Sequence, residues 1–193
     1  MDLERFLEKN QEQCLSKLPS YTPMSIWELP KYKPTHNCYA YASRNLQPNL
    51  SGKLQPGQLS HQRPLQPDEY SCSNFKHLIA LDNPGAIFMD ENKPCPCGYT
   101  KAFLTLDVKE PYRDYHFYRE NFDPATGQFL WMHKPGSLSV KTTDGSGNLI
   151  SDPRYANRNE RPYEYDVDCG YICFPPPKPN SYLALAKQRL GLS

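Results

Sequence analysis

The sequence predicts an α+β fold in which helices near the N-terminus pack on a mainly antiparallel sheet. In the first part of the chain, apolar residues recur at helical spacing, which is typical of amphipathic helices. From Gly98 onward the pattern changes to short runs rich in aromatic and β-branched residues, separated by turn sequences. Helices followed by strands, with no internal repeat, indicate an α+β domain.

Four segments combine apolar residues at helical spacing with cap or stop residues. They are residues 2–17, 39–46, 68–81 and 181–190. Asp68 is expected to cap the third helix and Ser181 the last. Prolines forbid a long helix in the arm at 19–34, and residues 48–67, rich in Pro, Gln, Ser and Gly, predict a surface loop.

Four segments are expected to be strands. They are residues 98–107, 112–120, 128–134 and 167–174. The sequence Asp-Pro-Ala-Thr-Gly at 123–127 has turn chemistry, so the second and third strands should form an antiparallel hairpin. Asp-Gly-Ser-Gly at 144–147 predicts a second hairpin, between 138–141 and 148–150.

The length of 193 residues suits a single domain, 1–193. It divides into an N-terminal helix with a proline-rich arm (1–34), a core that carries the candidate site (35–174) and a C-terminal helix (175–193). Basic residues number 22 and acidic residues 21, for a formal charge of +1. This balance provides no field that would collect nucleic acid or anionic lipid, so neither is an expected partner.

The N-terminus carries charges where a signal peptide needs an apolar run, and no long apolar stretch predicts a membrane span. We therefore expect a cytoplasmic protein, or one exported without a cleaved signal peptide. Seven cysteines are an odd number. In a chain without an export signal this favours free thiols, a reactive thiol or a metal site over a disulfide framework.

Cys38 lies just before a short segment that can begin a helix. A helix start favours the thiolate, which is the attacking form of cysteine, because its unpaired N–H groups and the helix dipole attract negative charge. A nucleophilic thiol also needs a base, and His116, on the predicted strand at 112–120, is the best candidate. Cys38 and His116 are thus the predicted nucleophile and general base.

A third polar group usually orients the base through its second ring nitrogen. His133 suits this role if the hairpin places odd-numbered residues opposite even-numbered ones, for example His116 opposite His133, because the two histidines then share a face. The other parity would put Met132 opposite His116, and Asp114, Asp144 or Asp152 would serve instead. The oxyanion hole needs the Cys38 N–H and a side-chain donor, for which the candidates are Asn37, His36 and Tyr32.

This order of elements resembles the papain-like cysteine hydrolase superfamily, most nearly its compact bacterial cell-wall amidases and endopeptidases. Residues 37–42 (Asn-Cys-Tyr-Ala-Tyr-Ala) look like the nucleophile motif of that group, and Tyr-His-Phe-Tyr at 115–118 resembles its base strand. The resemblance spans about residues 30–135 and implies a papain-like fold, with Cys38, His116 and His133 as the triad. The aromatic neighbours of His116 and the long stretch between Cys38 and His116 depart from the pattern and suggest a distinct branch.

The remaining cysteines allow a competing interpretation. Cys95, Cys97, Cys169 and Cys173 would meet as a tetrahedral zinc site, although zinc favours two residues between paired cysteines and these pairs have one and three. The default for Cys14, Cys72, Cys169 and Cys173 is a buried free thiol, and for Cys38 alone it is a core residue. Residues 154–163, which alternate Tyr and Arg, are read as a solvated loop rather than a base-stacking surface.

The sequence therefore predicts a cysteine-dependent amide hydrolase or acyl transferase that needs no cofactor. Its expected substrate is a peptide or a peptidoglycan-like amide. The alternative is a noncatalytic interaction or effector module that keeps a papain-like layout, with or without a stabilising zinc ion.

Overall fold

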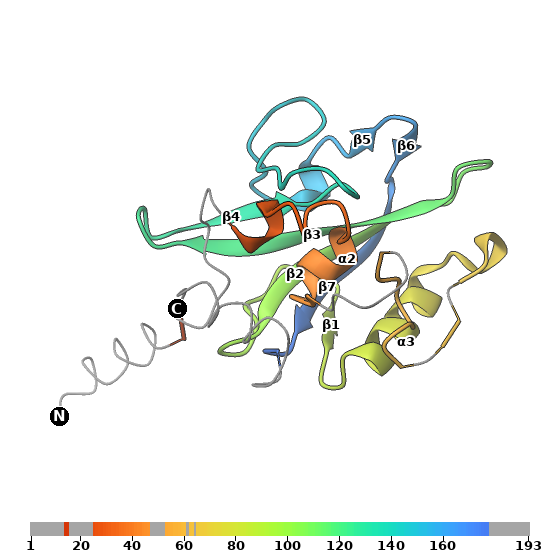
Figure 1. The fold of residues 1–193 in the computed structure, drawn as a ribbon, viewed down its shortest axis with the longest axis horizontal. Helices are drawn as coiled ribbons and strands as arrows, with labels where there is room; N and C mark the ends of the chain where they lie inside the picture. Colours follow the sequence, from red (N-terminus) through yellow and green to blue (C-terminus); the bar gives the residue numbers. More distant parts are fainter. Residues whose placement is uncertain (1–13, 16–24, 47–52, 61, 64, 178–193) are drawn as a thin grey trace.

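The computed structural model describes residues 14–15, 25–46, 53–60, 62–63 and 65–177. In this part the chain forms an α+β fold with a mainly antiparallel sheet, which confirms the predicted class (Figure 1). The predicted helix at 181–190 lies outside the described residues, as does the one at 2–17 apart from residues 14–15. None of the described helices has the length and apolar character that crossing a membrane requires.

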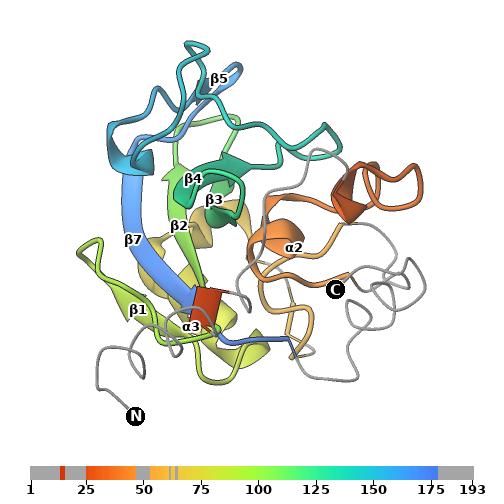
Figure 2. The same ribbon diagram turned by 90° about the vertical axis from the view of Figure 1, so that its left-hand side faces the viewer.

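Five antiparallel strands form the sheet, in the spatial order β1-β7-β2-β3-β4. They are β1 (Ile87–Met89), β2 (Thr100–Asp107), β3 (Asp114–Asp123), β4 (Gln128–His133) and β7 (Val167–Phe174). The last strand thus inserts between β1 and β2 (Figure 2). The four predicted strands are confirmed, the last with its predicted ends and the other three with shifted ends, whereas the three-residue β1 was too short to predict.

Buried side chains cover both faces of the sheet. Two helices, α2 (Cys38–Ala42) and α3 (Cys72–Asp82), pack on one face, where the ring of Tyr39 contacts that of Phe117. On the other face, aromatic side chains of the sheet pack against Ile150. Because strand side chains alternate, His116 lies on the face opposite to Phe117.

The β3–β4 hairpin forms as predicted. The Asp123 carboxylate accepts hydrogen bonds from the Ala125 N–H and the Thr126 hydroxyl, and Gly127 adopts a φ of 70°, which completes the turn. The register places Tyr118 opposite His133. His133 therefore has the parity that puts it on the face of His116, although it pairs with Tyr118 and not with His116 itself.

The helices begin or end at residues other than those expected. Helix α2 stops at Ala42 instead of continuing to residue 46, because Arg44 adopts a left-handed φ of 57°. Helix α3 is capped by Ser71, whose hydroxyl accepts from the Asn74 N–H. Asp68 instead belongs to a separate 3-10 turn, Pro67–Glu69.

The segment between β4 and β7 is less regular than predicted. The hairpin around 144–147 is reduced to a single bridge between Thr143 and Leu149. Residues 154–163 are not a plain loop, because they contribute to a 3-10 turn (Pro153–Tyr155) and to the small two-stranded sheet of β5 (Asn159–Glu160) and β6 (Tyr163–Glu164).

Candidate active site

A cavity of about 470 Å³ lies where the start of α2, the start of β3, the loop after β4 and the β5–β6 hairpin meet. Cys38 and His116 both line it, as the sequence predicts for a nucleophile and its base. The other lining residues include aromatic rings and charges of both signs. Among them, the aromatic rings include Tyr70, Tyr163 and Tyr165, the positive charges are Lys53 and Arg161, and the negative charges are Asp114 and Glu160.

Cys38 lies beside a part of β3 that β4 does not cover. The β4 pairing ends at His133, opposite Tyr118, so the edge of β3 before Tyr118 has no β4 partner. The buried Cys38 thiol contacts this edge, where its Sγ donates to the Tyr115 carbonyl oxygen over 3.9 Å. Cys38 and His116 thus line the same cavity although α2 packs on the face of the sheet opposite to His116.

The thiol is not activated in the resting structure. Burial, reinforced by the Asp114 carboxylate, raises the pKa of Cys38 to about 12, while the N–H groups of Phe117, Tyr39 and Cys38 itself oppose the rise. The prediction that the helix start would lower this pKa is wrong, because α2 has only five residues and its N–H groups do not compensate for the lost water. Cys38 is a neutral thiol at pH 7.

His116 and His133 form a directed hydrogen-bonded pair. His116 Nε2 lies 2.8 Å from His133 Nδ1, and His133 Nε2 lies 3.0 Å from the Thr143 carbonyl oxygen. A carbonyl oxygen only accepts, so His133 carries its proton on Nε2 and its Nδ1 accepts from His116 Nε2–H. In neutral His116 the unprotonated nitrogen is therefore Nδ1, the atom a general base needs.

The surroundings keep both imidazoles neutral. Burial lowers the pKa of His116 well below its usual range, and repulsion from Lys141, and from His133 whenever that ring is protonated, adds to the effect. Burial also lowers the pKa of His133. The ring of Tyr165 packs on His116 with 5.2 Å between ring centroids, and its hydroxyl donates to Asp114 Oδ2 over 2.8 Å.

The three oxyanion-hole candidates occupy different places. Asn37 lines the cavity, but its Nδ2 donates to the Leu54 carbonyl and the Tyr115 hydroxyl, and its Oδ1 caps α2 by accepting from the Ala40 N–H. His36 and Tyr32 do not line the cavity and pack against each other instead. Their role in an oxyanion hole stays a prediction.

The three aspartates that were alternatives to His133 also lie in different places relative to the cavity. Asp114 lines the cavity, whereas Asp144 accepts backbone N–H groups within its own turn, such as that of Ser146. Asp152 is bound to Arg154 and to the Tyr171 hydroxyl. Of the four residues considered for the third position, His133 is the one hydrogen-bonded to His116.

The other six cysteines form disulfides, so the expectation of free thiols at Cys14, Cys72, Cys169 and Cys173 is wrong, as is that of a zinc site. The pairs are Cys14–Cys97, Cys72–Cys169 and Cys95–Cys173, and Cys38 is the free cysteine. The alternative zinc ligands Cys95, Cys97, Cys169 and Cys173 are therefore oxidised and cannot bind a metal as thiolates. No cluster of metal-binding side chains occurs among the described residues. The seventh cysteine, which has no disulfide partner, is Cys38, the predicted nucleophile.

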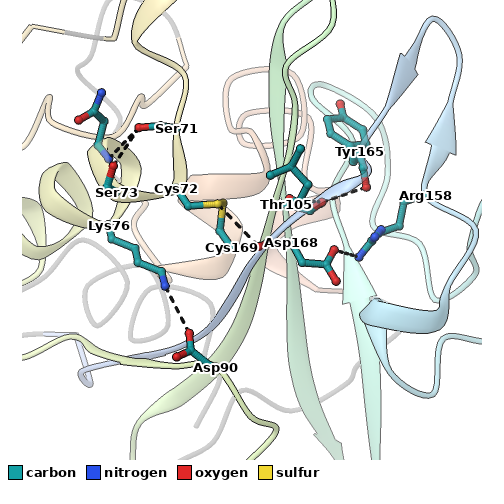
Figure 3. The surroundings of a disulfide bond; sticks show 12 residues. Ser71, Cys72, Ser73, Lys76, Asp90, Thr105, Arg158, Tyr165, Asp168 and Cys169 are labelled. Carbon is teal, nitrogen blue, oxygen red and sulfur yellow. Dashed lines mark hydrogen bonds and ion pairs between the residues drawn. A yellow bond between two sulfur atoms is a disulfide. The ribbon is translucent and has the colours of Figure 1, made fainter.

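The Cys72–Cys169 disulfide joins the start of α3 to β7 near the cavity (Figure 3). Beside it, at a register shift between β2 and β7, the single proton of the Thr105 hydroxyl is shared between the carbonyl oxygens of Tyr165 and Val167, each 3.0 Å from Oγ1. These contacts hold the backbone of Tyr165, the residue whose ring packs on His116. Neither the disulfide nor the role of Tyr165 was predicted.

Gln55 is a second cavity residue that the sequence did not reveal. The loop at 48–67 was expected on the surface, yet Gln55 lines the cavity and its Oε1 accepts from the Tyr115 hydroxyl over 2.6 Å. The loop is drawn inward by the Asp82 carboxylate, which accepts from the N–H groups of Gly57 and Ser60. The signal that could have revealed this was Leu54, an apolar residue in a polar loop.

The chain is similar to insoluble matrix shell protein 1 from Ruditapes philippinarum. The two are 33% identical over 135 residues, which cover 68% of this chain and 77% of that protein. No family model matches the chain, and no solved structure matches it.

Proposed function

This chain belongs to the family of insoluble matrix shell protein 1, and we propose that it is a cysteine-dependent amide hydrolase or acyl transferase. One observation carries the proposal: the single unpaired cysteine lines the same cavity as a histidine whose second nitrogen is hydrogen-bonded to another histidine. A buried core cysteine needs neither partner. The chain would use Cys38 as nucleophile, His116 as general base and His133 as orienting residue.

The proposed reaction begins with both groups neutral. The Cys38 proton passes to His116 Nδ1 as Sγ bonds to the substrate carbonyl carbon. The imidazolium then returns this proton to the leaving amine as the C–N bond breaks, which leaves a thioester. Water or a second amine attacks the thioester and gives its proton to His116, and as the C–S bond breaks His116 returns that proton to Sγ, which restores the free thiol and the neutral imidazole. Hydrolysis and acyl transfer differ only in this last nucleophile.

The papain-like arrangement belongs to the same proposal. A nucleophile at the start of a helix, a base on a strand and an orienting residue on the neighbouring strand are its elements, and the Cys38 N–H would serve in the oxyanion hole. The substrate would be a peptide or a peptidoglycan-like amide, because the cavity offers both cationic and anionic side chains to a chain with mixed charges.

We also propose that the protein is exported. Three disulfides in one small domain are typical of chains that fold in an oxidising compartment, and the relative is named as a matrix protein of the shell. Acyl transfer between matrix proteins would then be one use of the site.

The experiment is hydrolysis or amine incorporation by the purified, oxidised protein on a panel of peptides and peptidoglycan fragments. We expect Cys38→Ala to remove at least about three orders of magnitude of activity and His116→Ala about two or more. His77→Ala, an exposed histidine on α3, is the matched control and should act as the wild type. Activity that survives in Cys38→Ala contradicts the proposal.

A second candidate is a noncatalytic matrix component. The name of the relative favours it, as does the raised pKa of the Cys38 thiol, since a matrix protein needs no thiolate. This candidate predicts that wild type and Cys38→Ala behave alike, without turnover, and that both enter an insoluble matrix to the same extent.

A further inference from the structure

Lys134 is a fully buried lysine directly after His133. Its ammonium donates to four backbone carbonyl oxygens, those of Lys33 (2.7 Å), His36 (2.7 Å), Gly136 (2.8 Å) and Leu138 (3.1 Å). All four partners are neutral carbonyl groups. The ammonium therefore occupies a cage of backbone oxygens of the kind that binds a monovalent cation.

The four carbonyls belong to two segments that are far apart in the sequence. Lys33 and His36 lie in the arm that leads into Cys38, while Gly136 and Leu138 lie in the loop after β4 and line the cavity. The Ser137 hydroxyl adds a second link between these segments by donating to the Pro34 carbonyl oxygen over 3.2 Å. Lys134 thus ties the approach to the nucleophile to the strand that carries His133.

A buried ammonium is a poor source of stability, because lost hydration offsets most of what its hydrogen bonds contribute. An apolar side chain of the same length would cost less to bury but would leave the carbonyls unpaired and the two segments unlinked. The charged ammonium donates hydrogen bonds to both segments, and these bonds fix the distance between the two segments. His36 lies two residues before Cys38 and Lys134 directly follows His133, so the ammonium links the backbone beside Cys38 to the backbone beside His133.

We propose that Lys134 is a positioning residue that holds the Cys38 thiol at working distance from the His116–His133 pair. The inference rests on the proposed function, because it assigns Lys134 a role in the same dyad. It does not require that the substrate be known, since the reactivity of Cys38 reports on the dyad directly.

The test is the rate at which iodoacetamide alkylates Cys38 in the oxidised protein at pH 7, where Cys38 is the free thiol. His116→Ala should slow alkylation because the thiol loses its base. Lys134→Met should slow it by roughly tenfold or more, because a displacement of about 1 Å is enough to uncouple such groups. Lys101→Met is the matched control: Lys101 is also mostly buried but pairs with Glu120 away from the cavity, and its loss should leave the rate unchanged.

Two further measurements separate positioning from a general loss of structure. In a His116→Ala background, Lys134→Met should cause no additional slowing, because its effect passes through His116. Lys134→Ala, which vacates the oxygen cage, should regain most of the wild-type rate when propylammonium is added, and the Lys101→Met control should not respond to the amine.

Four outcomes overturn the proposal. The first is an alkylation rate in folded Lys134→Met equal to that of the wild type, and the second is additive slowing when Lys134→Met is combined with His116→Ala. The third is an alkylation rate of Lys134→Ala that does not respond to propylammonium. The fourth is failure of Lys134→Met and Lys134→Ala to fold even with the amine, which would make Lys134 a requirement of the fold. If His116→Ala itself leaves alkylation unchanged, the proposed dyad fails and the positioning role fails with it. If His116→Ala slows alkylation and Lys134→Met does not, only the positioning role fails.

Discussion

Cys38 and His116 are held as neutral groups, and this is the main chemical property of the site at the level of residues. Burial raises the pKa of the thiol and lowers that of the imidazole, so both shifts disfavour a resting thiolate–imidazolium pair. Charge would develop only when a substrate carbonyl accepts the electrons of Sγ. The Thr143 carbonyl contributes at a distance, because it selects the tautomer of His133 and through it that of His116.

Three buried histidines predict acid sensitivity. Burial lowers the pKa of His36, His116 and His133 in the folded protein, whereas the unfolded chain titrates near 6.5. Below pH 6.5 the unfolded state therefore binds more protons, and stability, fully present above that pH, is lost as the pH falls towards the folded pKa values. Each histidine accounts for a loss of up to about 1.4 kcal/mol of unfolding free energy per pH unit in this range.

Urea unfolding at pH 7 and pH 5 measures this loss. His116→Gln should weaken the pH dependence because one of the three titrating groups is gone, and His77→Gln, on the exposed side of α3, should leave it as in the wild type. If His116→Gln and the wild type lose the same unfolding free energy between pH 7 and pH 5, His116 is not one of the titrating groups.

At the level of elements, the site depends on where α2 begins and where β4 ends. Asn37 caps α2 and links it to the Leu54 carbonyl and the Tyr115 hydroxyl, so the helix start is tied to the loop and strand that flank the cavity. The end of β4 at His133 exposes the β3 edge that the Cys38 thiol contacts. One more pair of residues in β4 would occupy that edge.

Asn37→Ala should therefore lower the unfolding free energy more than the loss of an ordinary helix cap does. It removes the cap and two buried hydrogen bonds, for about 2 kcal/mol or more of unfolding free energy, whereas Ser71→Ala, which removes the exposed cap of α3, should cost about 1 kcal/mol. Chemical denaturation gives both values. Only Asn37→Ala should change the alkylation rate of Cys38, and similar effects of the two variants on both measurements would show that Asn37 is a cap alone.

At the level of the whole molecule, disulfides join segments that are far apart in the sequence. Their separations are 83, 97 and 78 residues, so each closes a long loop and restricts the unfolded chain strongly. Two of them connect α3 and the segment before β2 to β7, an interior strand of the sheet, and the third joins Cys14 to Cys97.

Replacing Cys72 and Cys169 together by alanine should lower the unfolding free energy by about 2–5 kcal/mol. A thiol-reactive dye in denaturant without reductant should detect one thiol per chain, Cys38, and seven after reduction. Cys38→Ala is the control, with no thiol before reduction and near wild-type stability. Several reactive thiols in the unreduced wild type would contradict the pairing.

The sequence by itself determined the α+β class, the four long strands and the β3–β4 hairpin, and it provided Cys38, His116 and His133 as the residues of the proposed site. These follow from local chemistry: side-chain periodicity, the turn residues around Asp123, and the residue types that acyl transfer needs. Ser71 replaced Asp68 as the cap of α3 because several polar residues there can cap equally well, and the local pattern does not distinguish them.

Only the tertiary structure decided which cysteines pair, how the hairpin is registered and what lines the cavity. Disulfide connectivity depends on which Cα atoms approach to about 5 Å, and residues 72 and 169 meet only after β7 inserts between β1 and β2. Burial likewise reversed the expected activation of Cys38, because the free energy of a charged thiolate depends on the water that the whole fold excludes. The cage around Lys134 joins residues a hundred positions apart in the sequence, for which no local pattern exists.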